Sequence, residues 1–207
     1  MGTTERRIRE RKQREEQIIN AAEKVFFENG FDDSTMDEVA EAAELSKGAL
    51  YIYYKNKNEL CISIVCRALV LVLEGFRKVY ADKKLSGLKM IAQSGMSFQR
   101  FYRIFPKYYC ALLSYQQHRG GCGADSAFLQ DTLEANRRIN ELLSLMLQKG
   151  MEDGSIRHNI NAGKTALTLW GDLGGLIPGF VLNGEDSGSQ ELFENAIDLI
   201  CRGLSKK

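Results

Sequence analysis

The stretch that decides the fold runs from Thr35 to Lys57 and reads TMDEVAEAAELSKGALYIYYKNK. In its first half the apolar and small residues Met36, Val39 and Ala40 recur at helical spacing, and the acidic residues between them are left to face solvent. A second short segment, SKGALYIYY, follows. The pattern predicts two short helices joined by a tight turn.

Three side chains mark helix starts in this stretch. Thr35 precedes Glu38 by three residues, the capping-box arrangement in which hydroxyl and carboxylate each bond to a free backbone N–H group. Ser46 is a second expected N-cap, and Asn56, three residues before Glu59, is a third. Helix starts this close together leave room only for short turns.

The second of these helices has the residues that a DNA-reading helix needs. A helix that enters the major groove must begin with a slim turn and present groups that touch bases and phosphates. Gly48 and Ala49 keep that turn slim. Lys47 supplies a cation and Tyr51 a hydroxyl, groups that commonly bond to phosphate oxygens. A tyrosine on a short helix can instead be a half-buried packing residue, so both interpretations of Tyr51 stay open here.

The surrounding residues carry a family resemblance. The segment AAEKVFFENGFDDSTMDEVAEAAELSKGALYIYYKNKNEL, which begins at Ala21, resembles the DNA-binding domain of the TetR/AcrR family of bacterial one-component regulators. In that family the first helix ends in an aromatic, glycine, aromatic pattern, which Phe26, Gly30 and Phe31 match. Tyr54 stands where the family most often has Phe, and we expect it to be packed. Combining the resemblance with the residue pattern, we expect these DNA-binding residues: Thr35, Ser46, Lys47, Gly48, Ala49, Tyr51, Tyr53 and Lys57.

Positive charge is local rather than spread over the chain. The 207 residues are 44% hydrophobic and 27% charged, which is enough for a small domain and a larger one, and the net charge is only +1. General attraction to nucleic acid is therefore not expected. Residues 1–14 hold six basic and two acidic side chains. We expect this basic arm to precede the first helix, either lying along DNA or frayed in the free protein.

Other classes of protein find no support in the sequence. The charged N-terminus and the short apolar runs, of which Ala68 to Leu73 is the longest, favour a cytoplasmic protein with no membrane partner. The five cysteines lack CxxC spacing and the two histidines lack metal spacing, so we expect reduced thiols, no metal and no cofactor. Redox sensing by Cys110 or Cys122 stays an alternative. No catalytic constellation is assembled, and we expect no enzyme.

Beyond residue 60 the helical pattern continues, so the chain is predicted to be all-α with about nine helices. The expected domains are a helix-turn-helix DNA-binding domain over 1–57 and a ligand-binding and dimerisation bundle over 58–207. A long helix from Asn58 to Ala81 is expected to link them, with these residues facing inward: Leu60, Val65, Leu69, Leu73 and Phe76. The remaining expected helices are 87–103, 106–118, 127–151, 162–182 and 189–204.

The family's C-terminal domain implies dimerisation, and two segments are candidates for the interface. Helix 162–182 contains several glycines, each costing about 1 kcal/mol relative to alanine unless close packing offsets it. The final helix has more apolar surface than one neighbour needs. We expect a four-helix dimer interface, with a core helix pair inside a monomer as the alternative. Its predicted residues are Gly171, Gly174, Gly175, Leu192, Ala196, Leu199 and Ile200.

Aromatic residues gather between Phe98 and Tyr115, where they can line an apolar cavity or form plain core. As a set they favour a hydrophobic or aromatic ligand over a sugar or a phosphate. The candidate pocket residues are Phe98, Phe101, Tyr102, Phe105, Tyr109, Leu113 and Trp170. The cations proposed for an acidic headgroup are His118, Arg119, Arg137 and Arg138.

Together these features predict a ligand-responsive transcriptional regulator. We expect a repressor that binds a palindromic operator on double-stranded DNA as a homodimer and is released by a small-molecule inducer. A dimer suits a palindrome because its two recognition helices address half-sites one turn, or a multiple, apart. The alternatives are an activator, and a DNA-binding regulator or scaffold without a small-molecule ligand.

Overall fold

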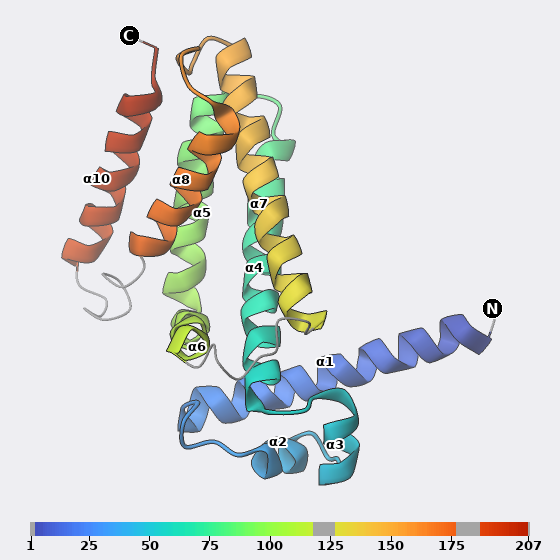
Figure 1. Cartoon of the computed structure of the whole chain (residues 1–207). Coiled ribbons are helices and arrows are strands. Elements are labelled where there is room, and N and C mark those ends of the chain that lie inside the picture. The colour runs from blue at the N-terminus through green and yellow to red at the C-terminus, as the bar shows by residue number, and fades with distance from the viewer. Residues whose placement is uncertain (1–2, 118–126, 177–186, 207) are drawn as a thin grey trace. The chain divides into compact units, whose positions relative to one another are not determined.

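The computed structural model describes residues 3–117, 127–176 and 187–206, and in this part of the chain helices are joined by turns and short irregular segments (Figure 1). It contains no strand within those ranges, only an isolated antiparallel bridge between Ile156 and Ser205. The predicted all-α class is confirmed. The described helices are α1 (Thr3–Asn29), α2 (Met36–Ala42), α3 (Lys47–Tyr53), α4 (Lys57–Ala81), α5 (Gly87–Ile104), α6 (Pro106–Gln117), α7 (Ala127–Glu152), α8 (Ala162–Leu176) and α10 (Ser187–Leu204).

The chain divides into two compact units. The first unit comprises Met1–Arg67 and Cys110–Thr132, and the second comprises Ala68–Tyr109 and Leu133–Lys207. Helices α4, α6 and α7 therefore each contribute residues to both units. The predicted division into a DNA-binding domain over 1–57 and a ligand-binding and dimerisation bundle over 58–207 stays a prediction.

The start of each short helix in the first unit is fixed by the side chain predicted to cap it. Thr35 and Glu38 form the full capping box, with Glu38 N bonding to Thr35 Oγ1 at 3.2 Å and Thr35 N to Glu38 Oε2 at 2.7 Å. Ser46 Oγ accepts the N–H three residues later at 3.2 Å, and Asn56 Oδ1 accepts Glu59 N at 3.0 Å. These three caps are confirmed.

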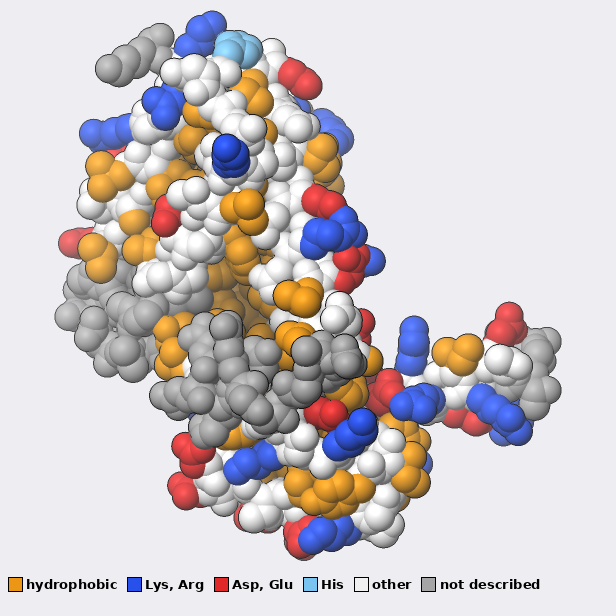
Figure 2. All heavy atoms as spheres, in the orientation of Figure 1, with side chains coloured by type: hydrophobic (Ala, Val, Ile, Leu, Met, Phe, Trp, Pro, Cys, Tyr) orange, Lys and Arg blue, Asp and Glu red, His pale blue; other side chains and the backbone are white. Residues whose placement is uncertain are grey.

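Helix α1 ends where the aromatic and glycine pattern predicts, but it begins earlier than expected. Gly30, with φ +87°, closes it, because glycine adopts this left-handed conformation without steric cost. At the other end the basic arm is part of α1 rather than a preceding segment. The segment from Thr3 to Asn29 holds neither glycine nor proline, and the pairs Arg6–Glu10 and Arg11–Glu15 bridge successive turns. Figure 2 shows basic and acidic side chains interspersed there.

The second unit is built around α5, which approaches its neighbours closely at two glycines. A Cβ at Gly95 would overlap Ile197 of α10, and a Cβ at Gly87 would overlap the backbone of Gly150 in α7. The start of α5 is also fixed by Asp153, whose carboxylate accepts the N–H of Gly87 at 2.8 Å. The α4 residues predicted to face inward are all buried: Leu60, Val65, Leu69, Leu73 and Phe76.

Candidate nucleic-acid interface

Helix α3 is anchored on one side and open on the other. Leu50 is fully buried, as is Tyr54 at its C-cap. The exposed residues are spaced so that they share one arc of the helix: Lys47, Gly48, Tyr51 and Ile52. Tyr51 is 43% exposed, so part of its ring is open to a partner, and its role in DNA binding stays a prediction. Ile52, which the sequence analysis did not select, is 73% exposed.

Lys47 is held by an acidic neighbour on α2. Its Nζ lies 2.8 Å from Asp37 Oδ1, and both side chains are well exposed. The hydrogen bond to Asp37 raises the pKa of Lys47, so the cation stays charged at neutral pH. An exposed pair of this kind contributes little to stability, and an incoming phosphate can replace the carboxylate.

Two other predicted contact residues combine capping with exposure. Thr35 is exposed, and its hydroxyl donates to Glu38 Oε2 at 2.9 Å, so a phosphate contact by this donor would have to replace that bond. Ser46 is exposed while its oxygen caps α3. Beside them, half-buried Tyr53 faces Arg11 of α1, whose Cζ lies 5.6 Å from the ring centroid. This contact brings one cation of the basic arm next to α3.

Lys57, also predicted to face DNA, has a clear part in the fold. Its Nζ donates to the backbone carbonyls of Phe31, Asp32 and Ser34 at 2.5, 3.0 and 2.8 Å. These three bonds use all three ammonium donors. Lys57 therefore fastens the start of α4 to the turn between α1 and α2, and a contact with DNA stays a prediction.

Arg67, near the middle of α4, also holds α4 against α1, and this contact was not predicted from the sequence. Its guanidinium bonds to Glu16, Asn20 and Glu23 of α1 at 2.6, 2.8 and 2.8 Å. Arg67 and Glu23 are mostly buried, with side-chain exposures of 18% and 16%. Nothing in the local sequence marks this clasp, because its members lie more than 40 residues apart.

The predicted pocket residues of the second unit pack on one another. Phe98 lies edge-on to Tyr102 at 5.0 Å and to Trp170 at 5.5 Å, and Tyr102 meets Tyr109 at 6.2 Å. Phe101 contacts Tyr102, Phe105 and Tyr108 in the same cluster. Burial raises the pKa of Tyr102. Leu113 is half-buried and belongs to the first unit.

A small cavity in the second unit is lined by other residues. Its volume is about 10 Å³, far below the several hundred Å³ of a typical ligand pocket. Its lining comprises Ile91, Gly95, Leu143, Leu169, Leu173, Ile197 and Ile200. A ligand that enters at this cavity must therefore separate side chains that now touch.

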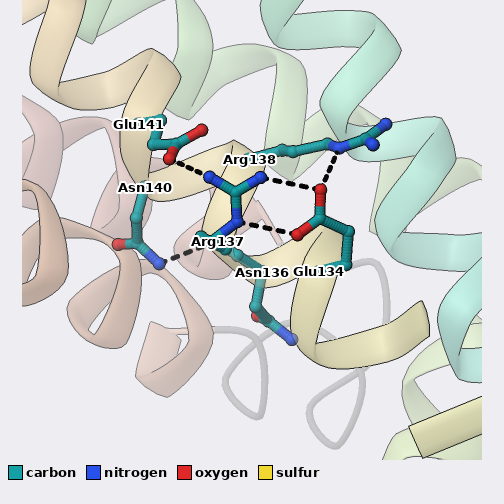
Figure 3. A network of polar contacts seen from close by, with 6 residues as sticks. All are labelled: Glu134, Asn136, Arg137, Arg138, Asn140 and Glu141. Atoms are coloured by element: carbon teal, nitrogen blue, oxygen red, sulfur yellow. Dashed lines mark hydrogen bonds and ion pairs between the residues drawn. The ribbon is translucent and has the colours of Figure 1, made fainter. Parts of the chain in front are cut away.

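The cations proposed for an acidic headgroup are already paired where the structure describes them. Arg137 bonds to Glu134 and Glu141, and Arg138 bonds to Glu134, all along the exposed side of α7 (Figure 3). The hydrogen bond from Arg137, supported by that from Arg138, lowers the pKa of Glu134 to about 2. His118, Arg119 and Cys122 lie outside the described residues.

Most of the predicted dimer residues are open on the described chain. Leu192 and Leu199 are 55% and 59% exposed, two turns apart on α10, with half-buried Ala196 between them and half-buried Ile200 beside them. A Cβ built at each of the three predicted glycines of α8 meets nothing within 4 Å: Gly171, Gly174 and Gly175. Leu167, which was not predicted from the sequence, is 61% exposed one turn before Gly171.

The cysteines divide by environment. Cys110 is exposed, whereas burial raises the pKa of Cys66 and of Cys201 and so disfavours their reactive thiolates. In the described ranges, moreover, no helix is both long and apolar enough to cross a membrane.

Residues 18–64, which include this surface, match the family model described as bacterial regulatory proteins, tetR family. Over 198 residues the chain is 22% identical to the fatty acid metabolism regulator protein of Bacillus subtilis (strain 168), covering 92% of this chain and 95% of that one. Over 53 residues it is 42% identical to the HTH-type transcriptional repressor BepR of Brucella suis biovar 1, covering 26% and 25% of the two chains.

A solved structure agrees in fold over nearly the whole length. The transcriptional regulator FadR from Bacillus subtilis in complex with stearoyl-CoA superposes with a TM-score of 0.69 at 20% identity, covering 91% of this chain and 98% of that one. The helical architecture is thus shared beyond the N-terminal match.

Tyr54 offers a test of how α3 is held. Its ring stacks on Phe128 at 4.8 Å, and its buried hydroxyl lies near Ser63 without forming a hydrogen bond of standard geometry among the described residues. Tyr54→Phe should change the free energy of unfolding by less than about 1 kcal/mol, since it removes only an unsatisfied group. Tyr54→Ala should lower it by about 3–5 kcal/mol through the cavity it leaves. Urea denaturation measures both, and equal losses would contradict this account.

Proposed function

Because this chain belongs to the TetR/AcrR family of bacterial transcriptional regulators, we propose that it is a ligand-released repressor that binds a palindromic operator as a homodimer. The observation that carries the proposal is the exposed arc of α3, where a cation and a tyrosine hydroxyl flank the bare backbone of Gly48. Within residues 3–117, 127–176 and 187–206, we find no comparable arrangement in favour of an enzymatic role. We place the protein in the cytoplasm, where the bacterial chromosome lies.

Each predicted residue has a part in the proposed complex. Lys47 and Tyr51 bond to phosphates or base edges, while Gly48 and Ala49 allow α3 to approach the groove. Thr35, Ser46 and Tyr53 extend the phosphate contacts around them. Lys57 acts by holding the turn before α2. It contacts the DNA backbone if a phosphate oxygen replaces one of the backbone carbonyls to which its ammonium group donates.

The proposed dimer forms through α8 and α10. Exposed leucines lie on both helices, and the glycines of α8 leave space for a second backbone, features that suit a close four-helix contact. A two-fold dimer presents two copies of α3, matching the two halves of a palindrome.

The proposed inducer is a small hydrophobic or aromatic molecule. Phe98, Tyr102 and Trp170 supply an apolar, aromatic environment but touch one another, so a ligand must wedge them apart. A long acyl chain is the first class to test, because the Bacillus subtilis structure with a similar fold is a complex with stearoyl-CoA.

In the proposed mechanism, α4 carries the response. It contributes residues to both units, and Lys57 and Arg67 tie it to the turn before α2 and to α1. A ligand that binds better when α4 is shifted moves the population toward that state and changes the spacing of the two α3 helices. The dimer then no longer fits both half-sites. An activator, or a regulator without a ligand, would share the DNA surface but not this response.

The first experiment is selection of binding sites from random duplex DNA with the purified protein. We expect an enriched palindrome. Lys47→Ala and Tyr51→Ala should weaken its binding, and Lys47→Ala should also make the slope of log affinity against log salt concentration shallower by about one for each phosphate that Lys47 neutralises. Asp37→Asn is the matched variant and should strengthen binding to the palindrome, because it frees Lys47 and removes a negative charge. Failure of folded protein to enrich any site in moderate salt would overturn the proposed function.

The dimer is tested by placing charge on the proposed interface. Leu199→Arg should yield a monomer in sedimentation velocity, because an unpaired guanidinium would have to be buried. Leu145→Arg, at a 45% exposed leucine of α7, is the control that should remain dimeric. If Leu199→Arg stays dimeric while both variants remain folded, another surface forms the dimer.

The inducer class is tested through Trp170, the single tryptophan of the chain. Titration with stearoyl-CoA should change its fluorescence, because the wedged ligand alters ring contacts with Phe76 and Phe98, and should release bound operator. Coenzyme A alone, lacking the acyl chain, should do neither. Operator binding that ignores acyl-CoA and a panel of aromatic hydrophobes alike would favour a regulator without a ligand of this class.

A further inference from the structure

Ile52 is an exposed aliphatic side chain at one edge of the proposed DNA-facing arc. At 73% it has the highest exposure among the large hydrophobic side chains of the described residues. Single exposed aliphatic residues are common on protein surfaces and need no explanation by themselves. What distinguishes Ile52 is its position on a seven-residue helix whose buried side is filled by Leu50.

The residue one turn earlier makes Ile52 more prominent. Side chains on a helix lean toward its N-terminus, so that of Ile52 lies over the surface next to the residue four positions before it. That residue is Gly48, which has no side chain, and a Cβ built there meets nothing within 4 Å. The pair therefore forms an apolar projection beside bare backbone, with Lys47 and Tyr51 along the same arc.

The chemistry of the major groove limits what such a projection can recognise. Base edges there present hydrogen-bond donors, acceptors and one apolar group, the C5-methyl of thymine. Helix α3, KGALYIY, holds no Arg, Asn, Gln, Asp or Glu, so hydrogen bonds from its side chains to base edges can come only from Lys47 and the hydroxyls of its two tyrosines. Ile52 has no polar atom in its side chain, so favourable contact with a base edge requires the methyl group.

We propose that Ile52 is a specificity residue that selects a thymine in each half-site by packing against its C5-methyl group. The inference rests on the proposed function, since it requires α3 to enter the major groove. Lys47 lies on the same arc in an exposed ion pair with Asp37, and a phosphate can replace that carboxylate, which favours duplex DNA over an apolar protein surface as the partner of this arc.

The test replaces each thymine of the selected site by deoxyuridine, first in one half-site and then at the symmetric positions of both half-sites. This change removes the methyl group and leaves base pairing intact. For the wild-type protein we expect one position at which the affinity falls about four-fold per half-site, the factor for one buried methyl-sized group. With both half-sites changed together, the loss should be about sixteen-fold, because the half-sites act independently.

The deciding comparison measures binding of Ile52→Ala to the thymine site and to the same site with deoxyuridine. This variant should bind the thymine site more weakly and show no further loss with deoxyuridine. Ile104→Ala removes an isoleucine 57% exposed on α5 and should retain the full deoxyuridine penalty. Equal penalties for Ile52→Ala and wild type, or no sensitive thymine in an enriched site, would overturn the inference while leaving the proposed function standing. If no site is enriched at all, the proposed function fails and the inference fails with it.

Discussion

The first unit depends on the way the start of α4 is held against the turn that follows α1. A single ammonium group, that of Lys57, accepts no bond and donates three, and all three go to carbonyls of Phe31, Asp32 and Ser34. These carbonyls follow the end of α1 and have no place in a helical ladder. Satisfying them with one cation fixes the direction in which the chain enters α2 and the position from which α4 departs.

This constraint matters because α2 and α3 are too short to be stable alone. Each has seven residues, well under the length at which an isolated helix persists in water. Their order comes from caps at Thr35 and Ser46 and from burial of Val39 and Leu50 against the rest of the unit. One side of α3 is thus committed to the core, which leaves the other side free for a partner without loss of stability.

Local features of the sequence predicted the fold well, and long-range ones were missed for a physical reason. Caps such as Thr35 with Glu38 act over three residues, so the helix starts could be predicted from neighbours alone. The clasp of Arg67 on α1 and the stacking of Tyr54 on Phe128 join residues far apart in sequence, and no spacing rule indicates them. The candidate surface was likewise predicted only where a single residue indicates its role. Lys47 and Tyr51 could be chosen by residue type alone. Ile52 could be recognised only from its exposure in the structure, because an apolar residue on a helix is ordinarily assigned to the core.

The carboxylate of Asp37 has a consequence for how a regulator would search a chromosome. It lies beside Lys47. If the proposed function is correct, a phosphate of any DNA sequence would bind at the same place. Competition from this carboxylate weakens every encounter by a similar factor, independent of base sequence. Random sites vastly outnumber an operator, and they rely on phosphate contact alone, whereas an operator adds base contacts. If the proposed function is correct, the acidic neighbour would thus shorten the time spent on irrelevant DNA and leave more free protein to find its target.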